Sequence, residues 1–407
     1  MLFDPITLPC GQVLKNRAAK AAMEENMADA NHYPSIELKN LYAAWAKGGV
    51  GLIISGNVMI DKMAMTGPGG VVLEKHTPLE AFKDWAQHAK QDGCAAVLQI
   101  NHPGRQVMKA MGGKNVSPSD VAVDIGKHSN LLAQPSPLTA DEIEEVIQRF
   151  VDTAKNALQA GFDGVQIHAA HGYLLSQFLS PLTNKRQDDW GGDLHSRAKI
   201  LYVIVERVRA ALGAKSIVAI KMNSADFQRG GFDVADAIEV VKHLNSLQVD
   251  FIELSGGSYE APAMQGKSGD ERSLAREAYF LEFAQQIAEH ADMPIMTTGG
   301  IKRLETAEKV LASGVDLVGM ASALAYEPAL VNIWKKQPEL VGFVPRVNWK
   351  DKALSALATM ALVKRQLRKM GANKPTDSSS SPLLSLIMDR VRLNKLTKKY
   401  RKWIGVA

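Results

Sequence analysis

The sequence predicts an α/β fold, a (β/α)8 barrel, and two observations support this class. Eight short apolar segments alternate with segments of helical periodicity, a pattern typical of buried parallel strands and their crossover helices. The alternation fills about the first 340 of the 407 residues, a length that suits one barrel with insertions. A doubly wound sheet is the competing architecture. Its dinucleotide site needs a glycine-rich turn after the first strand, where this chain has Glu24-Glu25-Asn26, so we expect the barrel.

The expected elements follow one another along the chain. Strands are expected at Ala18–Met23, Val50–Ser55, Ala95–Ile100, Gly164–His168, Ile217–Met222, Val249–Leu254, Pro294–Thr298 and Val315–Met320. Helices are expected at Ser35–Lys47, Pro78–Gln91, Thr139–Ala160, Leu194–Leu212, Asp233–Leu247 and Leu304–Ser313. Thr139 and Glu142 have the spacing of a capping box, which marks a helix start. Residues 102–138, rich in Gly, Pro, Ser and Asn, are too long for a plain loop and are expected to form an insertion over the active face, after the third strand.

The charge distribution divides the chain into two parts, a barrel in residues 1–340 and a basic, helical extension in residues 341–407. The last 58 residues, from Lys350, carry 14 Lys and Arg against 3 acidic residues. The first 349 residues carry 34 basic and 40 acidic residues. A partner attracted by charge would therefore be recruited by the extension.

Two helices are expected in the extension, at Ala353–Met370 and Leu383–Ile404. The first is expected to pack on the barrel. The second has two interpretations: a basic face that is simply solvated, or a contact with an anionic membrane. In the membrane interpretation Tyr400 and Trp403, which lie among the cations of Lys395–Trp403, would be the interfacial aromatics.

The composition excludes several classes of protein. Cys10 and Cys94 are too few for a disulfide framework, a four-cysteine zinc site or a cysteine-ligated iron–sulfur cluster. The N-terminus lacks a basic region followed by an apolar one, and no long apolar run is present, so neither a signal peptide nor a membrane span is expected. We expect a cytoplasmic protein, with membrane-peripheral contact through the extension as the open alternative.

The most informative chemistry lies after the fourth strand, in His168-Ala169-Ala170-His171-Gly172-Tyr173. Catalytic groups of barrels lie at the C-terminal ends of the strands. Two imidazoles can hold one oxygen that gains charge, and a phenol with a pKa near 10 is a proton donor at neutral pH. A metal-binding pair and two packed structural histidines are the alternatives, but no third ligand follows at a familiar spacing.

Other strand ends indicate a phosphorylated heteroaromatic cofactor. Thr298-Gly299-Gly300 runs into a helix after the seventh strand, where backbone N–H groups of barrels bind phosphate. Gln99 near the end of the third strand can both donate to and accept from a planar heterocycle. Lys221 places a cation at the end of the fifth strand.

The chain resembles the old yellow enzyme family, the FMN-containing NADH:flavin oxidoreductases, over about residues 1–340. The motifs that carry the resemblance are His168–Leu174, Gln177–Pro181, Asn184–Gly192, Leu14–Arg17, Gly48–Ile53 and Leu98–Arg105. The resemblance implies a (β/α)8 barrel that binds FMN non-covalently. It also implies a reaction in which hydride from NADH or NADPH reduces the C=C bond of an activated alkene, an α,β-unsaturated carbonyl or nitro compound.

The resemblance also implies a role for single positions. His168 and His171 match the pair that binds the substrate oxygen, and Tyr173 matches the proton donor to the α-carbon. The positions expected around FMN are Ala22, Met23, Glu24, Asn57, Gln99, Lys221, Thr298, Gly299, Gly300, Ala321 and Ser322. No metal site and no nucleic acid are expected. Substrate choice is expected to depend on residues 102–138 and on the segment Tyr259–Lys267.

Three positions depart from the family pattern. Glu24 stands where Thr or Cys is frequent, and an ionised carboxylate there should lower the flavin potential unless burial protonates it. Lys221 stands where most members have arginine, which keeps the charge but loses the planar fork. Ala321-Ser322 replaces a Gly-Arg pair that holds phosphate, which leaves phosphate to backbone amides and to Ser322 or to another cation such as Lys302.

Two rival functions remain open. A dihydrouridine synthase is also an FMN barrel with a basic C-terminal region, but it needs a catalytic cysteine near the active site, and neither Cys10 nor Cys94 is placed for that. A flavin-binding carrier or sensor that has lost catalysis is the other, and the intact His168, His171 and Tyr173 argue against it. A homo-oligomer is compatible with both the main and the rival functions.

Overall fold

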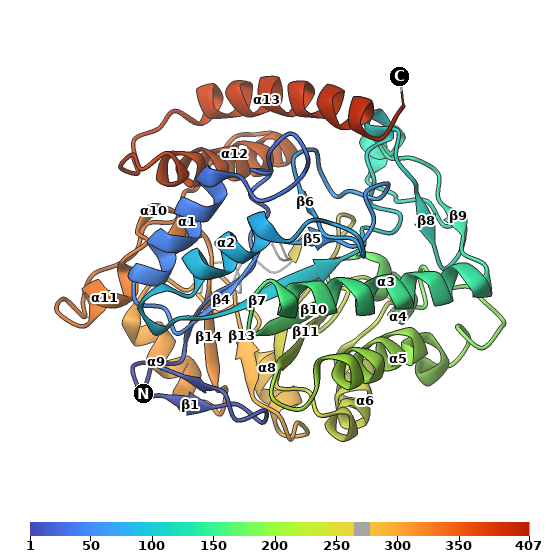
Figure 1. The fold of residues 1–407 in the computed structure, drawn as a ribbon, viewed down its shortest axis with the longest axis horizontal. Coiled ribbons are helices and arrows are strands. Elements are labelled where there is room, and N and C mark those ends of the chain that lie inside the picture. Colours follow the sequence, from blue (N-terminus) through green and yellow to red (C-terminus); the bar gives the residue numbers. More distant parts are fainter. Residues whose placement is uncertain (264–276, 407) are drawn as a thin grey trace.

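The computed structural model describes residues 1–263 and 277–406, which form a closed barrel (Figure 1). Its wall consists of eight parallel strands: β3 (Ala18–Lys20), β4 (Leu52–Ile54), β7 (Ala95–Asn101), β10 (Gly164–Ala169), β11 (Ile217–Asn223), β12 (Phe251–Ser255), β13 (Ile295–Thr297) and β14 (Leu317–Met320). Each pairs with the next, and β14 pairs with β3 through Val318 and Ala18, which closes the sheet. The predicted (β/α)8 barrel is confirmed. The first strand is shorter than expected, because it ends at Lys20 and not at Met23.

Helices surround the barrel. The longer ones are α1 (Ile36–Lys47), α2 (Glu80–Ala89), α3 (Ala140–Gln159), α5 (Leu194–Leu212), α6 (Val234–Leu244), α8 (Leu281–Ala288) and α9 (Leu304–Ala312). The shorter ones are α4 (Leu174–Leu179), α10 (Ser322–Tyr326) and α11 (Leu330–Trp334). The expected capping box is present, because Thr139 and Glu142 each accept a backbone N–H of the other. The helix expected to end at Leu247 ends as an α-helix at Leu244 and continues as a single 3₁₀ turn.

Short strands lie outside the barrel wall. A hairpin of β1 (Ile6–Thr7) and β2 (Val13–Leu14) lies beside the N-terminus, and β5 (Val58–Met59) with β6 (Val71–Val72) extends the sheet beyond β7. The expected insertion after the third barrel strand is present. It contains β8 (Val116–Ser117), β9 (Ser136–Pro137) and two 3₁₀ turns, Lys109–Met111 and Gly126–Leu131.

The barrel interior changes from apolar to polar along the strands. Side chains of a strand alternate between the interior and the surrounding helices. The interior positions near the N-terminal ends are apolar: Ala19, Leu52, Val97, Ala219, Phe251, Met296 and Leu317. The next interior positions along the strands are polar: Gln99, Gln166, Lys221 and Glu253, followed by Asn101, His168, Asn223 and Ser255. The fold thus collects polar side chains at the C-terminal ends of the strands.

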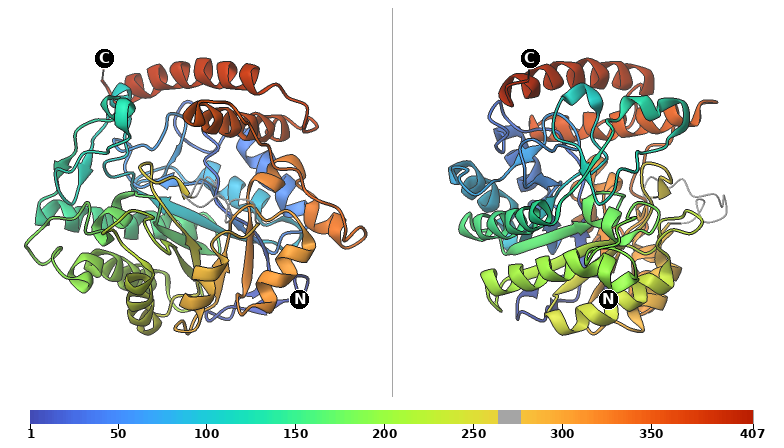
Figure 2. Two further views of the ribbon diagram at one scale, coloured as in Figure 1. Left: turned by 180° about the vertical axis from the view of Figure 1, so that it is seen from behind. Right: turned by 90° about the vertical axis from the view of Figure 1, so that its right-hand side faces the viewer.

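The C-terminal extension forms α12 (Lys352–Gly371) and α13 (Pro382–Trp403), as expected. The two helices are stacked at one edge of the molecule, and α13 is the outermost layer (Figures 1 and 2). α12 packs on α1, α10 and α13. Within the described residues no helix has the length and apolarity needed to cross a membrane. The division of the chain at residue 340 stays a prediction.

Candidate active site

The side chains predicted to form the site come together at one end of the barrel, because the C-terminal ends of parallel strands meet there. Three of the residues lie within strands: Gln99 in β7, His168 in β10 and Lys221 in β11. The others lie in the segments that follow the strands: Ala22, Met23 and Glu24 after β3, Asn57 after β4, and His171 and Tyr173 after β10. Thr298, Gly299 and Gly300 come after β13, and Ala321 and Ser322 come after β14. No predicted site residue lies at the other end of the barrel.

Three rings form the centre of this end. The ring centroids of His168 and Tyr173 are 5.0 Å apart, as are those of His168 and His171, and His171 lies 6.5 Å from Tyr173. Tyr259, from the segment after β12, packs edge-on against Tyr173 at 6.2 Å. Residues 264–267 of the segment expected to influence substrate choice lie outside the described residues.

The backbone of His171 is held in an unusual conformation. Its φ of 62° lies in the left-handed region, which costs free energy for a residue with a side chain. The His171 N–H donates to Asn223 Oδ1 at 3.0 Å, and its carbonyl accepts from Gln106 Nε2 at 2.9 Å. Gly172 follows with φ 71°, and a side chain there would collide with Ser258. The sharp turn therefore depends on these contacts, and it places both imidazoles side by side.

Each imidazole uses one nitrogen within the protein. Nδ1 of His168 accepts the N–H of Ala170 at 3.3 Å, which leaves its Nε2 as a donor. Nε2 of His171 lies 2.7 Å from Ser255 Oγ. If the hydroxyl donates, Nδ1 of His171 carries the proton and is the second donor.

The electrostatics keep both imidazoles neutral and Tyr173 protonated. Burial, reinforced by the positive charge of Lys221, holds the pKa of His168 and His171 well below 6.5. Burial also raises the pKa of Tyr173 well above 10, and Tyr259 and Glu24 raise it further. At neutral pH this arrangement supplies two neutral imidazoles and one proton donor.

A buried chain of polar groups lies directly below the rings. Gln99 Nε2 donates to Gln166 Oε1 at 2.7 Å, and Gln166 Nε2 donates to Glu253 Oε2 at 2.9 Å. Lys221 Nζ donates to Glu253 Oε1 at 2.8 Å. Lys221 therefore lies where it was expected, but its charge is paired with a carboxylate that the sequence analysis did not single out.

Glu24 is paired with the C-terminal extension. Lys364 Nζ, from α12, lies 3.4 Å from Glu24 Oε2 and also donates to Asn26 Oδ1. Thr66 donates to Glu24 Oε1 at 2.6 Å and accepts from Asn57 Nδ2 at 3.3 Å. Burial alone would raise the pKa of Glu24, but the charge of Lys364 and the hydrogen bond from Thr66 hold it below its ordinary value. The lowered pKa favours the ionised form of Glu24 that the sequence analysis considered, and the ion pair with Lys364 is a feature that it did not predict.

The loops after β13 and β14 offer backbone donors. Gly299 has φ 128°, a conformation that favours glycine, and a side chain there would meet Tyr279. The backbone N–H groups of Gly299, Gly300 and Ser322 donate to no acceptor within the described residues. Unpaired N–H groups of this kind can bind an anion.

Both cysteines lie away from this end of the barrel. Cys94 immediately precedes β7, and the Cys10 N–H donates to Asp250, which immediately precedes β12. Burial raises the pKa of the Cys10 thiol to about 11 and that of the Cys94 thiol to about 12. Neither thiol is placed at the strand ends where a catalytic cysteine would be needed.

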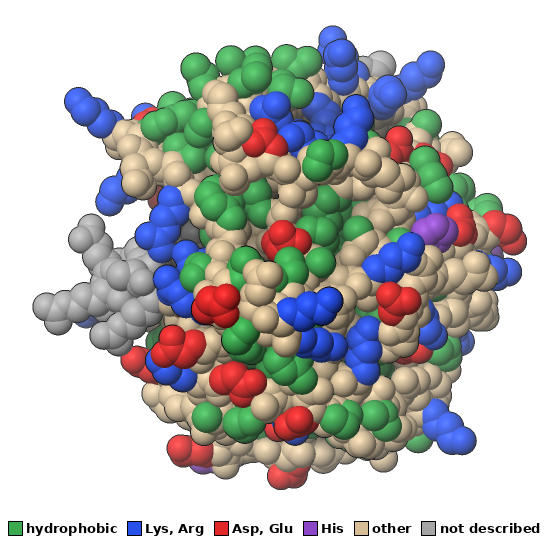
Figure 3. Space-filling model, turned by 90° about the vertical axis from the view of Figure 1, so that its left-hand side faces the viewer, with side chains coloured by type: hydrophobic (Ala, Val, Ile, Leu, Met, Phe, Trp, Pro, Cys, Tyr) green, Lys and Arg blue, Asp and Glu red, His purple; other side chains and the backbone are tan. Residues whose placement is uncertain are grey.

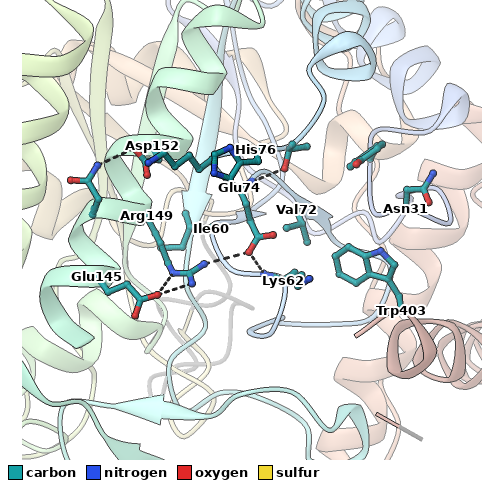
Figure 4. A pocket seen from close by; sticks show the side chains of 14 residues that line it. Asn31, Ile60, Lys62, Val72, Glu74, His76, Glu145, Arg149, Asp152 and Trp403 are labelled. Carbon is teal, nitrogen blue, oxygen red and sulfur yellow. Dashed lines mark hydrogen bonds and ion pairs between the residues drawn. The ribbon is translucent and has the colours of Figure 1, made fainter. Parts of the chain in front are cut away.

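A separate cavity of about 520 Å³ lies outside the barrel, between α3, the segment after β5 and the end of α13 (Figure 4). Two of its carboxylates pair with one cation, since Arg149 contacts both Glu145 and Glu74. Trp403 lines one side and packs on His32 with ring centroids 4.4 Å apart. No predicted site residue lines this cavity.

Sequence reasoning missed four side chains of the site: Ser255, Glu253, Asn101 and Lys364. Strand alternation could have found the first two and Asn101, because they are interior positions near strand ends. Asn101 is fully buried, and neither atom of its amide has a partner within the described residues. No local signal marks Lys364, which comes from the extension.

Comparison with known proteins identifies the family. The family model of the NADH:flavin oxidoreductase / NADH oxidase family, Oxidored_FMN, matches residues 1–340. The chain belongs to this family. As a member it is an NAD(P)H-dependent flavin oxidoreductase of the old yellow enzyme type, with FMN as cofactor.

Individual relatives agree with this assignment. NADH-dependent flavin oxidoreductase iliE of Hypocrea jecorina (strain QM6a) is 35% identical over 348 residues, 80% of this chain and 86% of that protein. The iliE protein of Neonectria sp. (strain DH2) is 36% identical over 386 residues, and the match spans only 50% of its length. The structure of an old yellow enzyme homologue from Zymomonas mobilis matches with a TM-score of 0.71 and 27% identity, covering 84% of this chain and 94% of that one.

The residues at the strand ends fit the cofactor of this family. An amide at Gln99 and an ammonium at Lys221 suit the polar edge of a planar heterocycle, and the unpaired amide of Asn101 lies beside them in the interior. The unpaired N–H groups of Gly299, Gly300 and Ser322 suit a phosphate group. These backbone donors lie next to the position where the sequence has Ala321-Ser322.

Proposed function

We propose that the protein reduces the C=C bond of activated alkenes, α,β-unsaturated carbonyl or nitro compounds, with NADH or NADPH as reductant. The observation that carries the proposal is the group of three rings, two neutral imidazole donors beside a protonated tyrosine. This combination can hold a substrate oxygen that gains negative charge and donate a proton to the α-carbon of the substrate.

Residues around FMN are assigned by position. We propose that Gln99 and Lys221 contact its ring, that Ala22, Met23, Glu24 and Asn57 line it, and that Thr298, Gly299, Gly300, Ala321 and Ser322 surround its phosphate. FMN supplies the hydride chemistry when it is bound. The protein contributes orientation and electrostatics, and the paired state of Lys221 fixes that side chain in place.

We propose the following roles for the three rings. Nε2 of His168 and Nδ1 of His171 donate hydrogen bonds to the electron-withdrawing oxygen of the alkene and stabilise the enolate charge that develops there. Tyr173 gives its hydroxyl proton to the α-carbon. The raised pKa of Tyr173 keeps that proton in place until the carbon becomes basic.

The test is the steady-state reduction of 2-cyclohexenone by variants of the rings. Tyr173→Phe is expected to lower kcat by about 10²-fold or more with little change in KM, because a proton donor contributes about 10²–10⁴-fold. His168→Ala is expected to raise KM and lower kcat together. Tyr202→Phe is the matched control, since the Tyr202 hydroxyl is buried on α5 with no partner within the described residues. Full enone turnover by Tyr173→Phe would contradict the assigned role.

A further inference from the structure

The outward face of α13 exposes large apolar side chains in the first half of the helix. Leu383, Leu384, Ile387, Met388 and Val391 are each between 46% and 59% exposed. Their spacing places them on one stripe of the helix. Isolated exposed apolar residues are ordinary on protein surfaces, but a contiguous group marks an interaction site.

The same outward stripe is basic in the second half of the helix. Lys395, Lys398, Lys399 and Lys402 are exposed there, and Arg390 is exposed in the first half beside the apolar residues. Asp389 is the one acidic residue of α13, and it is buried and paired with Arg368 of α12. Figure 3 shows hydrophobic and Lys or Arg side chains gathered close together along the upper edge of the molecule, where α13 lies. The exposed stripe thus combines apolar and positively charged surface without a carboxylate.

The opposite face of α13 is fixed to the barrel. Tyr400 is fully buried and its hydroxyl donates to the carbonyl of Lys62 at 2.8 Å, while Arg392 donates to the carbonyl of Asn26 at 2.9 Å. Trp403 packs on His32. The expectation that Tyr400 is an interfacial aromatic is therefore wrong, because its side chain is fully buried, whereas Trp403 is half-buried. The docked helix must present its apolar stripe to the outside.

We propose that α13 is a docking surface for an anionic lipid bilayer and lies in the plane of the membrane interface. Leu383, Leu384, Ile387, Met388 and Val391 would enter the boundary between head groups and acyl chains, and the lysines would contact lipid phosphates and carboxylates. An anionic bilayer satisfies both halves of the stripe at once. The α13 of a second copy of this chain would match the apolar half but offer no exposed carboxylate to the basic half.

Vesicle co-sedimentation of the full-length FMN-loaded protein tests this proposal. The wild-type protein is expected to bind vesicles of phosphatidylcholine with phosphatidylserine and to bind pure phosphatidylcholine vesicles much more weakly. Ile387→Glu is expected to lower binding to the anionic vesicles by at least about tenfold. The change removes one apolar side chain that would be buried in the bilayer and adds a negative charge. Lys398→Glu is expected to lower it severalfold. Both variants should keep wild-type enone turnover and thermal stability.

Matched controls carry the same changes on other surfaces. Val13→Glu alters an apolar side chain that is 61% exposed on β2, and Lys155→Glu alters an exposed lysine on α3. Both should bind vesicles as the wild type does. Equal binding by wild type and Ile387→Glu would overturn the proposal. So would sedimentation velocity showing a wild-type dimer that Ile387→Glu dissociates, with no binding to vesicles, since the stripe would then be covered by a second copy.

Discussion

Glu24 and Lys364 are 340 positions apart in the sequence and form one ion pair at the candidate active site. The sequence offered two states for Glu24, an ionised carboxylate or one that burial protonates. Folding adds a partner that the sequence did not indicate, because α12 brings the cation of Lys364 to Glu24, which follows β3. The charge of Glu24 reaches Tyr173, whose pKa it raises, so the pair belongs to the electrostatics of the proposed proton donor.

Replacing Lys364 should show how much the ion pair with Glu24 contributes to the free energy of unfolding. We expect Lys364→Met to lower the free energy of unfolding at pH 7 by about 1–3 kcal/mol, because it leaves Glu24 without its charged partner. The double variant Glu24→Gln/Lys364→Met should recover most of that loss. Urea denaturation of the wild type and the variants, single and double, measures the coupling.

The difference in the free energy of unfolding between wild type and Lys364→Met should depend on pH in a direction that the pKa of Glu24 sets. The folded-state pKa of Glu24 is lowered, so its contribution is present above the ordinary carboxyl pKa and is lost as pH falls through the folded value. Without Lys364, burial raises the pKa of Glu24 in the variant, so the stability gap between wild type and Lys364→Met should be full at pH 7 and shrink as pH falls through the carboxyl range. A gap that is unchanged at pH 3 would show that Glu24 is not the partner that matters.

The histidines predict a pH profile for catalysis. Both have pKa values held well below 6.5, and Tyr173 has one held well above 10. All three groups therefore keep one protonation state between about pH 6 and pH 9. We expect kcat/KM for an enone to be flat over that range, in assays run with saturating reductant. An inflection near pH 6.5 that disappears in His171→Gln would contradict the neutral assignment.

At the scale of elements, strand ends were easier to predict than contacts between elements. Apolar runs bounded by polar residues located all eight barrel strands, because buried parallel strands have few other patterns. The helices of the extension were located as well. Which side of α13 faces the barrel was not predictable, since apolar and basic residues occur on both sides and Tyr400 is buried by contacts with distant loops.

Tyr400 predicts how firmly α13 is attached. Tyr400→Ala should lower the free energy of unfolding by about 3–5 kcal/mol if α13 unfolds with the barrel, because it opens a cavity among Met59, Met65, Val72 and Met111. Tyr400→Phe, which removes only the hydrogen bond to Lys62, should cost about 1 kcal/mol. Hydrogen exchange measures where the loss occurs. Faster exchange confined to α13 in Tyr400→Ala would show that the helix opens independently of the barrel.

At the scale of the whole molecule, the sequence predicted the barrel and the end that carries the chemistry. The side chains named from motifs meet at that end because closure of the sheet brings the ends of β3, β7, β10, β11, β13 and β14 together. The partners of those side chains were not predicted. Ser255 and Glu253 could have been found from strand alternation, but which side chains they contact depends on folding, and no local pattern marks Lys364.

The central claim is that this site passes hydride from NAD(P)H to an activated alkene. The most direct measurement is an anaerobic absorbance spectrum of the FMN-loaded protein, with NADPH added first and 2-cyclohexenone second, and NADH in a parallel series. We predict that the flavin band bleaches with the reductant and returns with the enone, and that it returns far more slowly in Tyr173→Phe. A band that bleaches but stays bleached after the enone would contradict the proposed alkene reduction.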